Sequence, residues 1–161
     1  MCIRDSARTL AEIAIQTAKV ARRFGVKPKV AMLSFSNFGT SEELRTDRIE
    51  EAIEIVRDKD PDLVIDGPMQ ADTALVNSIQ EDYPFMAFSG PANILICPNL
   101  TSANIAYKLL QRIAGAEMTG PILEGLAKPA HVLQRGDSVR DVVHMAAICA
   151  VDAIRYEQEK L

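Results

Sequence analysis

Short apolar runs alternate with amphipathic segments along most of this chain, and no other sequence feature restricts the fold as strongly. Three runs, 30–35, 63–65 and 92–97, have the length of buried strands and are bounded by proline or turn residues. The segments between them carry apolar residues at helical spacing. Strands that alternate with helices indicate a largely parallel sheet flanked by helices, so we predict an α/β fold.

Helix boundaries follow from apolar spacing and capping residues. In the first amphipathic segment Leu10, Ile13, Ala14 and Ala18 share one face, and Gly25 follows as a stop. Residues 1–6 lead into this segment without a recognisable cap, so we expect a truncated or non-native start. The predicted helices cover 7–24, 41–58 opened by Ser41 with Glu42 and Glu43, 69–80, 101–114 capped by Thr101 or Ser102, and a last helix capped by Ser138.

Turns and two further strands complete the prediction. The tripeptide Asp66-Gly67-Pro68 has the composition of a turn, and it should end the strand at 63–65. Residues 122–123 and 130–133 are short apolar pieces that we interpret as additional strands.

Composition excludes several classes of protein. Of 161 residues, 48% are hydrophobic and 25% charged, which is a globular profile. A net charge of −4 argues against a nucleic-acid surface. The sequence contains no run of about 18 apolar residues, so no membrane-spanning helix is predicted. Neither nucleic acid nor a membrane is therefore expected as a partner.

The cysteines and histidines do not indicate a metal site. The three cysteines form no CxxC pair, so neither zinc nor a redox dithiol is predicted. Cys97 and Cys149 lie in apolar runs, where a free thiol behaves as a small hydrophobe. The histidines, His131 and His144, are interpreted as structural residues. Unpaired cysteines fit a reducing compartment, and we expect a cytoplasmic protein.

Polar turns follow the predicted strands, where ligands bind in parallel sheets. Ser34, Ser36 and Asn37 could donate hydrogen bonds to phosphate or carbonyl oxygens, although the turn could equally be a solvated loop. Asp66 with Gln70 and Asp72 is better explained as acidic groups at a helix start.

A third constellation opens the last helix. Ser138-x-x-Asp141 resembles a capping box, and Arg135 just before it would complete an anion site at a helix N-terminus. The alternative is a plainly capped helix with a solvated arginine.

Four collinear segments resemble the phosphate acetyltransferase and butyryltransferase family: VAMLSFSNFGT, PDLVIDGPMQADTAL, ANILICPNLTSANIAYKLLQRIAGAE and TGPILEGLAKPAHVLQRGDSVRDVV. The resemblance implies a three-layer α/β/α fold with two lobes, similar to isocitrate and isopropylmalate dehydrogenases, which dimerises through one lobe. Residues 7–124 would form most of the second lobe, and 125–161 the segment that returns to the first. The chain would then be the C-terminal half of the domain.

The resemblance also implies residue roles. Asp141 matches the proposed base that deprotonates the CoA thiol, and Arg135 matches the arginine of an S-R-G motif that holds the phosphoryl group. Gln134 replaces the serine of that motif, which is thought to stabilise the transition state. Losing one such donor typically costs about 2.7–4 kcal/mol.

The segments AHVLQ and DGPMQADTAL also resemble motifs of the phosphotransacetylase-like domain of bacterial hybrid malic enzymes. This implies an acetyl-CoA-responsive module for regulation and oligomerisation, with Ser34, Ser36, Asn37, Gln134 and Arg135 near the ligand. NADP and Mg²⁺ or Mn²⁺ would belong to upstream domains. The alternatives are an active phosphate acetyltransferase, with Asp141 and Arg135 catalytic, and a purely structural dimerisation lobe.

Overall fold

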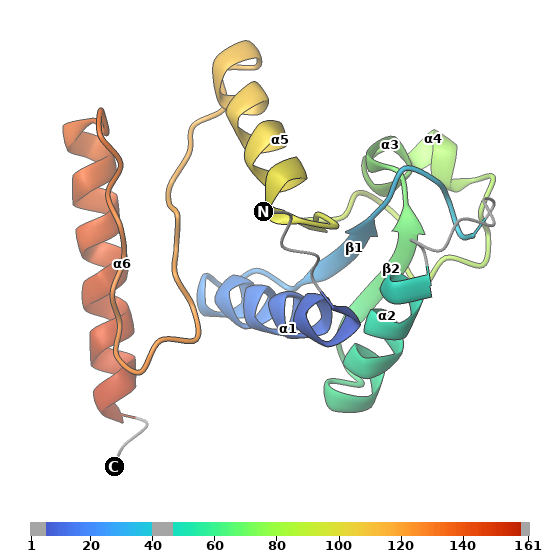
Figure 1. The fold of residues 1–161 in the computed structure, drawn as a ribbon, viewed down its shortest axis with the longest axis horizontal. Coiled ribbons are helices and arrows are strands. Elements are labelled where there is room, and N and C mark those ends of the chain that lie inside the picture. Colours follow the sequence, from blue (N-terminus) through green and yellow to red (C-terminus); the bar gives the residue numbers. More distant parts are fainter. Residues whose placement is uncertain (1–5, 40–46, 159–161) are drawn as a thin grey trace. The chain divides into compact units, whose positions relative to one another are not determined.

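The computed structural model describes residues 6–39 and 47–158 and divides the chain into two compact units, Met1–Ala106 and Tyr107–Leu161. Figure 1 shows the helices and strands of both units. The helices are α1 (Ala7–Arg23), α2 (Asp47–Lys59), α3 (Ala71–Leu75), α4 (Asn77–Gln80), α5 (Leu100–Ile113) and α6 (Val139–Gln158). The unit boundary falls within α5.

A parallel three-stranded sheet forms the centre of the first unit. Its strands are β1 (Lys29–Leu33), β2 (Val64–Met69) and β3 (Ile94–Ile96), in the order β2-β1-β3. Val30 of β1 lies opposite Ile65 of β2 and Ile94 of β3. The α/β class predicted from the alternating pattern is confirmed.

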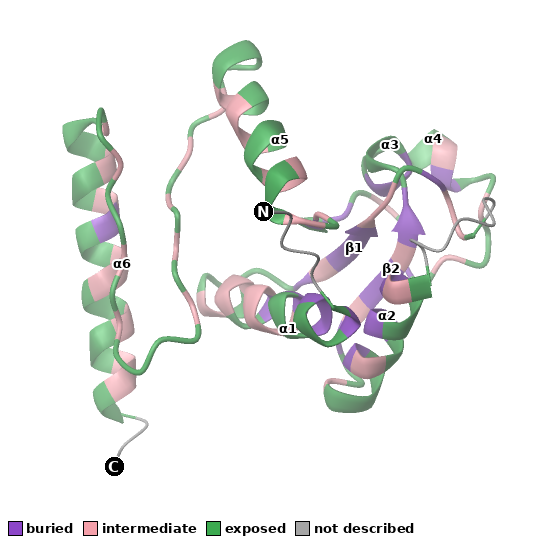
Figure 2. Cartoon of the chain, viewed as in Figure 1, coloured by how far each residue is buried: buried purple, intermediate pink, exposed green. Residues whose placement is uncertain are grey.

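Each face of the sheet has its own core. On one face Val30 and Met32 pack with residues of α1 and α2, including Ala14 and Val56. On the other face Ala31 packs with residues that follow β2, in α3 and the loop before β3. Figure 2 shows that burial in this unit concentrates on the strands and on the inner sides of α1 and α2.

Helix α1 meets the core through small side chains. Its buried residues are Leu10 and four alanines, Ala7, Ala11, Ala14 and Ala18. Ile13, which the spacing placed on the same face, is 40% exposed, so that assignment was wrong. The helix also has a cap that the sequence did not reveal, because the Ser6 hydroxyl accepts a hydrogen bond from Thr9 N at 3.1 Å. Residues 1–5 lie outside the described residues.

The turn expected at Asp66-Gly67-Pro68 is part of β2 instead. The strand continues to Met69, and its register with β1 shifts between Ala31 and Leu33, which is a bulge. Gly67 permits the bulge because a Cβ there would lie 2.6 Å from Met32 O. The residues that suggested a turn therefore form a bulge in β2. A bulge needs the same backbone freedom as a turn.

Two helix predictions need correction. The helix expected over 69–80 is two short helices, α3 and α4, separated at Val76, whose φ of −113° and ψ of 113° are extended. Helix α5 begins at Leu100, and its cap is Asn99, whose Oδ1 accepts from Ser102 N at 2.9 Å. The predicted opening of the second helix at Ser41 to Glu43 lies outside the described residues.

The second unit consists of the end of α5, an irregular segment and α6. The strands predicted at 122–123 and 130–133 are absent from the described residues, because a strand needs a neighbouring backbone to pair with and none is present there. His131 lies in this irregular segment, where its Nε2 is 3.1 Å from Asp152 Oδ2 on α6 and its Nδ1 accepts from Leu123 N. Within residues 6–39 and 47–158 no helix is long and apolar enough to cross a membrane.

Candidate functional site

The turn after β1 is tied to the end of β2. Asn37 Oδ1 accepts from Gln70 N at 2.7 Å, and Asn37 Nδ2 donates to Tyr83 Oη at 3.1 Å. Ser34 N donates to Met69 O at 2.8 Å. Gln70 Nε2 donates to Phe35 O at 2.7 Å. The Asn37 side-chain amide is therefore engaged in holding two loops together.

Ser36 differs from its neighbours in this turn. Its side chain is buried, and its hydroxyl has no hydrogen-bond partner among the described residues. A buried hydroxyl cannot reach a ligand from solvent, so the structure gives Ser36 no accessible donor. Of the three residues predicted in this turn, Asn37 has its side chain engaged within the protein and Ser36 has its side chain buried.

Phe38 is a feature of the same turn that the sequence did not indicate. It is the one non-glycine residue with positive φ in the described chain, at 47°, and its N–H donates to Pro68 O at 2.7 Å. Its ring packs against Tyr83 and Phe85, with centroids 5.2 Å and 4.9 Å away. A bulky residue in this region is unusual, and packing of the three rings stabilises it.

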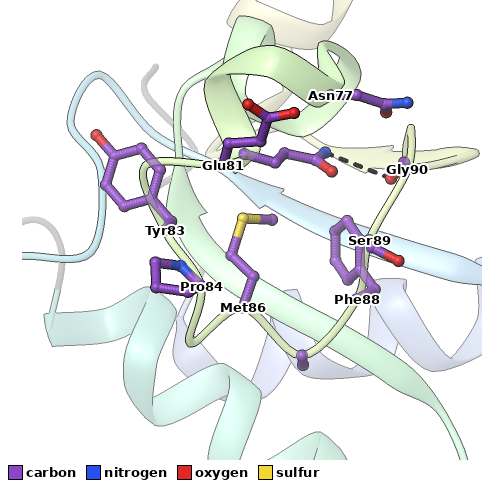
Figure 3. Close-up of a pocket in the computed structure, with 10 residues that line it drawn as sticks. Asn77, Glu81, Tyr83, Pro84, Met86, Phe88, Ser89 and Gly90 are labelled. Carbon is purple, nitrogen blue, oxygen red and sulfur yellow. Dashed lines mark hydrogen bonds between the residues drawn. The ribbon is translucent and has the colours of Figure 1, made fainter.

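A surface hollow of about 730 Å³ lies beside the loop that precedes β3 (Figure 3). Asn77 and Glu81 come from α4 and its end, and Tyr83, Pro84, Met86 and Phe88 come from the loop. The hollow has the size of a small-molecule site, and it has both apolar and polar walls. Ser34, Ser36 and Asn37 do not line it, but Asn37 contacts it indirectly through Tyr83.

Asp66 of β2 holds the loop before β3 in place through a hydrogen bond. Its Oδ2 accepts from Ala87 N at 2.6 Å and its Oδ1 accepts from Gly67 N at 2.9 Å. Arg57 Nη2 lies 3.9 Å from Oδ1. The interpretation of Asp66 as an acidic group at a helix start was wrong, because it lies within β2 and fastens a loop to that strand.

In the second unit, Gln134 forms a side-chain cluster with α5. Its Oε1 accepts from Lys108 Nζ at 3.1 Å and from Tyr107 Oη at 3.2 Å, and its Nε2 donates to the same hydroxyl at 3.1 Å. Lys108 Nζ also lies 4.6 Å from the Tyr107 ring centroid. Hydrogen bonds from Lys108 and Gln134 lower the pKa of the Tyr107 hydroxyl.

Ser138 and Asp141 form the capping box that the sequence predicted. Asp141 Oδ2 accepts from Ser138 N at 2.9 Å and from Ser138 Oγ at 2.7 Å, while Asp141 N donates to Ser138 Oγ at 3.2 Å. The hydrogen bond from the Ser138 hydroxyl, followed by that from its backbone N–H, lowers the pKa of the Asp141 carboxyl. These hydrogen bonds therefore favour the charged form of Asp141 at the start of α6.

Arg135 is exposed and has no hydrogen bond or ion pair with any residue in 6–39 or 47–158. Its neighbour Gln134 is held by two contacts, the side-chain cluster and a hydrogen bond of 2.6 Å from Gln134 N to Asp137 Oδ2. Gln134, Arg135 and Asp141 lie in one short segment of the sequence, where Arg135 is exposed. Ser34, Ser36 and Asn37 belong to the other unit.

Tyr107 and Lys108 are site residues that the sequence analysis missed. They precede Gln134 by 27 and 26 residues, and no spacing rule connects a helix surface with a distant loop. A basic residue beside a tyrosine on a helix is also too common a pair to single out. Across the described residues no group of three His, Cys, Asp or Glu side chains is arranged to hold a metal ion.

The thiol of Cys97 lies at the end of β3. Burial raises its pKa, and a hydrogen bond with Ser102 offsets part of that rise. The thiol is therefore protonated near neutral pH, as expected of a small apolar residue rather than a nucleophile.

Comparison with known proteins identifies the family. Residues 1–150 match the family profile described as phosphate acetyl/butaryl transferase. The chain belongs to this family. It is 49% identical over 147 residues to the NADP-dependent malic enzyme of Salmonella typhimurium, which covers 89% of this chain and 19% of that protein. It is 40% identical over 153 residues to the phosphate acetyltransferase of Bacillus subtilis, which covers 94% and 47% respectively.

Solved structures of the phosphate acetyl/butaryl transferase family have the same fold. A phosphotransacetylase from Streptococcus pyogenes aligns with a TM-score of 0.88 and 42% identity, over 96% of this chain and 47% of that chain. The family resemblance carried by the four segments is therefore confirmed. The chain spans about a fifth of the malic enzyme and less than half of the phosphotransacetylases that it matches.

Proposed function

We propose that this chain is the phosphotransacetylase-like region of a malic enzyme, where it binds acetyl-CoA, regulates upstream domains and takes part in self-association. Those domains oxidatively decarboxylate malate to pyruvate with NADP and Mg²⁺ or Mn²⁺, so these cofactors are assigned outside this chain. Residues 7–124 then belong to the second lobe of a fold related to isocitrate and isopropylmalate dehydrogenases, and 125–161 to the segment that returns to the first lobe.

The observation that carries the proposal is the state of Gln134. In the family motif a serine hydroxyl stands at this position, whereas here an amide engages Tyr107 and Lys108. A glutamine has no hydroxyl proton to give, and its oxygen is already satisfied by two donors. Transition-state stabilisation depends on donors aimed at developing charge, so a side chain committed elsewhere cannot supply it.

The Asp141 carboxylate also argues against acetyl transfer. General-base catalysis works best when the base has a pKa near the working pH. Two hydrogen bonds from Ser138 move the pKa of Asp141 in the opposite direction, below the ordinary value of an aspartate. The group is therefore better suited to cap α6 than to take a proton from a thiol whose pKa is about 8.5.

The second candidate function is phosphate acetyltransferase activity, and Arg135 favours it. Arg135 is exposed just before the start of α6, where an anion would meet both a positive charge and a helix N-terminus. In that case Arg135 holds the phosphoryl group and Asp141 serves as the base. Relatives named phosphate acetyltransferase match this chain at 40–45% identity, which keeps this candidate open.

The two functions are separated in the full-length protein by three measurements. The first is the formation of acetyl-CoA from acetyl phosphate and CoA. The second is the binding of acetyl-CoA by calorimetry. The third is NADP-dependent malate oxidation as acetyl-CoA is added. The proposal predicts no acetyl transfer, measurable acetyl-CoA binding and an altered rate of malate oxidation.

Acetyl transfer that is abolished by Asp141→Asn would establish the transferase instead. Binding of acetyl-CoA with no effect on malate oxidation would remove the regulatory role and leave a simple binding module. An absence of both binding and transfer would leave only a structural role in assembly.

A further inference from the structure

The hollow of Figure 3 carries negative charge but no positive charge on the described residues that line it. Glu81, at the end of α4, is exposed and supplies the carboxylate. The other lining side chains are neutral and polar, such as Asn77 and Ser89, or apolar, such as Met86 and Phe88. A concave surface of this composition favours a ligand that combines a positive charge with an apolar body.

A buried amide adds negative potential to the wall of the hollow. Gln80 lines the hollow and is 8% exposed, and its Nε2 donates to Thr73 O at 2.9 Å and to Gly90 O at 3.3 Å (Figure 3). These two acceptors establish which end of the amide is the nitrogen. The opposite end, Oε1, meets no donor among residues 6–39 and 47–158. The partial negative charge of this oxygen is therefore uncompensated, and a cation in the hollow would offset it through space.

Aromatic and thioether groups suit both parts of such a ligand. The face of a tyrosine ring attracts a cation. Tyr83 is restrained in its orientation, because its hydroxyl accepts from Asn37 Nδ2 and its ring packs against Phe38. Met86 lies between Tyr83 and Phe88 (Figure 3), and a thioether is an adaptable apolar surface.

One nearby positive charge opposes a cation at one end of the hollow. The Lys29 ammonium donates to Ser89 O at 2.6 Å and lies 5.7 Å from the Phe88 ring centroid. Figure 3 shows Glu81 and Tyr83 toward the other end. The charges therefore orient a ligand, with its cationic group toward Glu81 and Tyr83 and its apolar body toward Phe88.

We propose that this hollow binds a small organic ammonium ion, whose charge faces Glu81 and Tyr83 and whose apolar body packs against Met86 and Phe88. Alkylamines carry this charge at neutral pH, since the amine of lysine has a pKa of about 10.4. The site is separate from the proposed acetyl-CoA function, because none of the residues assigned to acetyl-CoA lines the hollow.

The test is calorimetric titration of the full-length protein with benzylammonium chloride at neutral pH and constant ionic strength. Benzyl alcohol, which has the same ring and no charge, is titrated in parallel. Benzylammonium should bind with a dissociation constant of about a millimolar or below, and benzyl alcohol should bind at least about threefold more weakly. Equal affinities of the two compounds, or no detectable binding of benzylammonium, would overturn the proposal.

Glu81→Gln removes the charge of the hollow and keeps its shape. It should weaken the binding of benzylammonium about two- to fivefold and leave that of benzyl alcohol unchanged. Asp82→Asn is the matched control, because Asp82 is the neighbouring exposed carboxylate and does not line the hollow. It should weaken binding less than Glu81→Gln does. Equal weakening by the two substitutions would overturn the site, since net charge alone would then explain it.

Tyr83 provides a second test that is independent of Glu81. Tyr83→Leu removes the ring face and should weaken the binding of benzylammonium about two- to fivefold. Tyr83→Phe keeps the ring and loses only the hydrogen bond with Asn37, so it should retain the affinity. An equal loss in both variants would overturn the ring contact, because the position of the loop would then control binding. Circular dichroism confirms that each variant is folded, and the comparison of the two compounds on the unchanged protein needs no variant.

Discussion

Asp66 shows how one buried carboxylate can hold a loop in place. The side chain is 8% exposed, and its two oxygens accept from the backbone N–H groups of Gly67 and Ala87. Ala87 belongs to the loop that lines the hollow of Figure 3. The shape of that loop therefore depends on a residue in the neighbouring strand.

Replacing Asp66 should destabilise the fold. Asp66→Ala leaves two backbone N–H groups without their acceptor, and we expect the free energy of unfolding to fall by about 1–3 kcal/mol. Urea denaturation followed by circular dichroism measures the change. Asp62→Ala, at an exposed position just before β2, is the control and should change stability by less than about 0.5 kcal/mol. Equal effects of the two substitutions would contradict the role assigned to Asp66.

Gly67 gives a second prediction at this scale. A Cβ at Gly67 would lie 2.6 Å from Met32 O and 3.0 Å from Met32 Cβ, and φ is 136°. Gly67→Ala should therefore cost about 2–6 kcal/mol, from crowding and backbone strain together. Gly25→Ala, where φ is 74° but nothing lies within 4 Å, should cost only about 1–2 kcal/mol. The two midpoints in urea report the difference, and similar midpoints would show that β2 shifts to accept the methyl group.

At the scale of elements, α6 depends on the capping box at its start. Ser138 and Asp141 exchange three hydrogen bonds. The two that the Asp141 carboxyl accepts from Ser138 lower the pKa of that carboxyl. A carboxyl whose pKa is lower in the folded state contributes stability above its unfolded pKa, near 4. This contribution is lost as pH falls through the folded value.

The consequence is a pH-dependent difference between the unchanged protein and Asp141→Asn. The unchanged protein should be the more stable of the two by a constant amount from about pH 5 to about pH 7, and the difference should shrink below about pH 4. Urea denaturation across this range measures it. Ser138→Ala removes the hydroxyl donor, so in that background the difference should be smaller at neutral pH. A difference that does not vary with pH would contradict the assignment.

The elements also show what sequence reasoning can reach. The helix over 7–24 and the strands at 30–35 and 92–97 were predicted because local spacing determines them, and they are found to within a few residues. The boundary of β2 was missed, because Asp66-Gly67-Pro68 reads the same in a turn and in a bulge and only the neighbouring strand distinguishes the two. The strands expected at 122–123 and 130–133 failed for a related reason, since β structure depends on a partner that local sequence does not reveal.

At the scale of the whole molecule, burial is distributed unequally between the units. The first unit has a buried cluster on each face of its sheet. Among the described residues of the second unit, Met145 is the one buried hydrophobic side chain (Figure 2). Stability that comes from apolar burial is therefore concentrated before residue 107.

Hydrogen exchange of the 161-residue chain should reflect this inequality. Amides of β1 and β2 should exchange slowest, since they open only when the sheet core opens, and amides of α6 should exchange faster by about tenfold or more. Mass spectrometry of peptic peptides measures both regions in one experiment. Helix α1 serves as the control, because it is a helix with a buried face and should behave like the strands. Equal protection of α1 and α6 would contradict the prediction.

In the candidate site too, contacts between sequence neighbours could be predicted, whereas contacts between residues far apart in the sequence could not. Gln134, Arg135 and Asp141 were singled out because they lie in one continuous motif, and their role at a ligand stays a prediction. The capping interaction of Ser138 with Asp141 is local and is found. Tyr107 and Lys108 could not be predicted, because their contact with Gln134 depends on the path of the chain over 26 residues. The turn at Ser34 to Asn37 was placed correctly at a strand end, but its hydrogen bonds to Gln70 and Tyr83 required tertiary structure.

The position of β1 in the middle of the sheet has a consequence for synthesis on the ribosome. In the order β2-β1-β3, the first strand of the sheet to be made is the one with which both others pair. Each later strand can add to a template that already exists, and the sheet needs no residue beyond Ile96. All three strands of the sheet are therefore synthesised before the segment that carries Gln134.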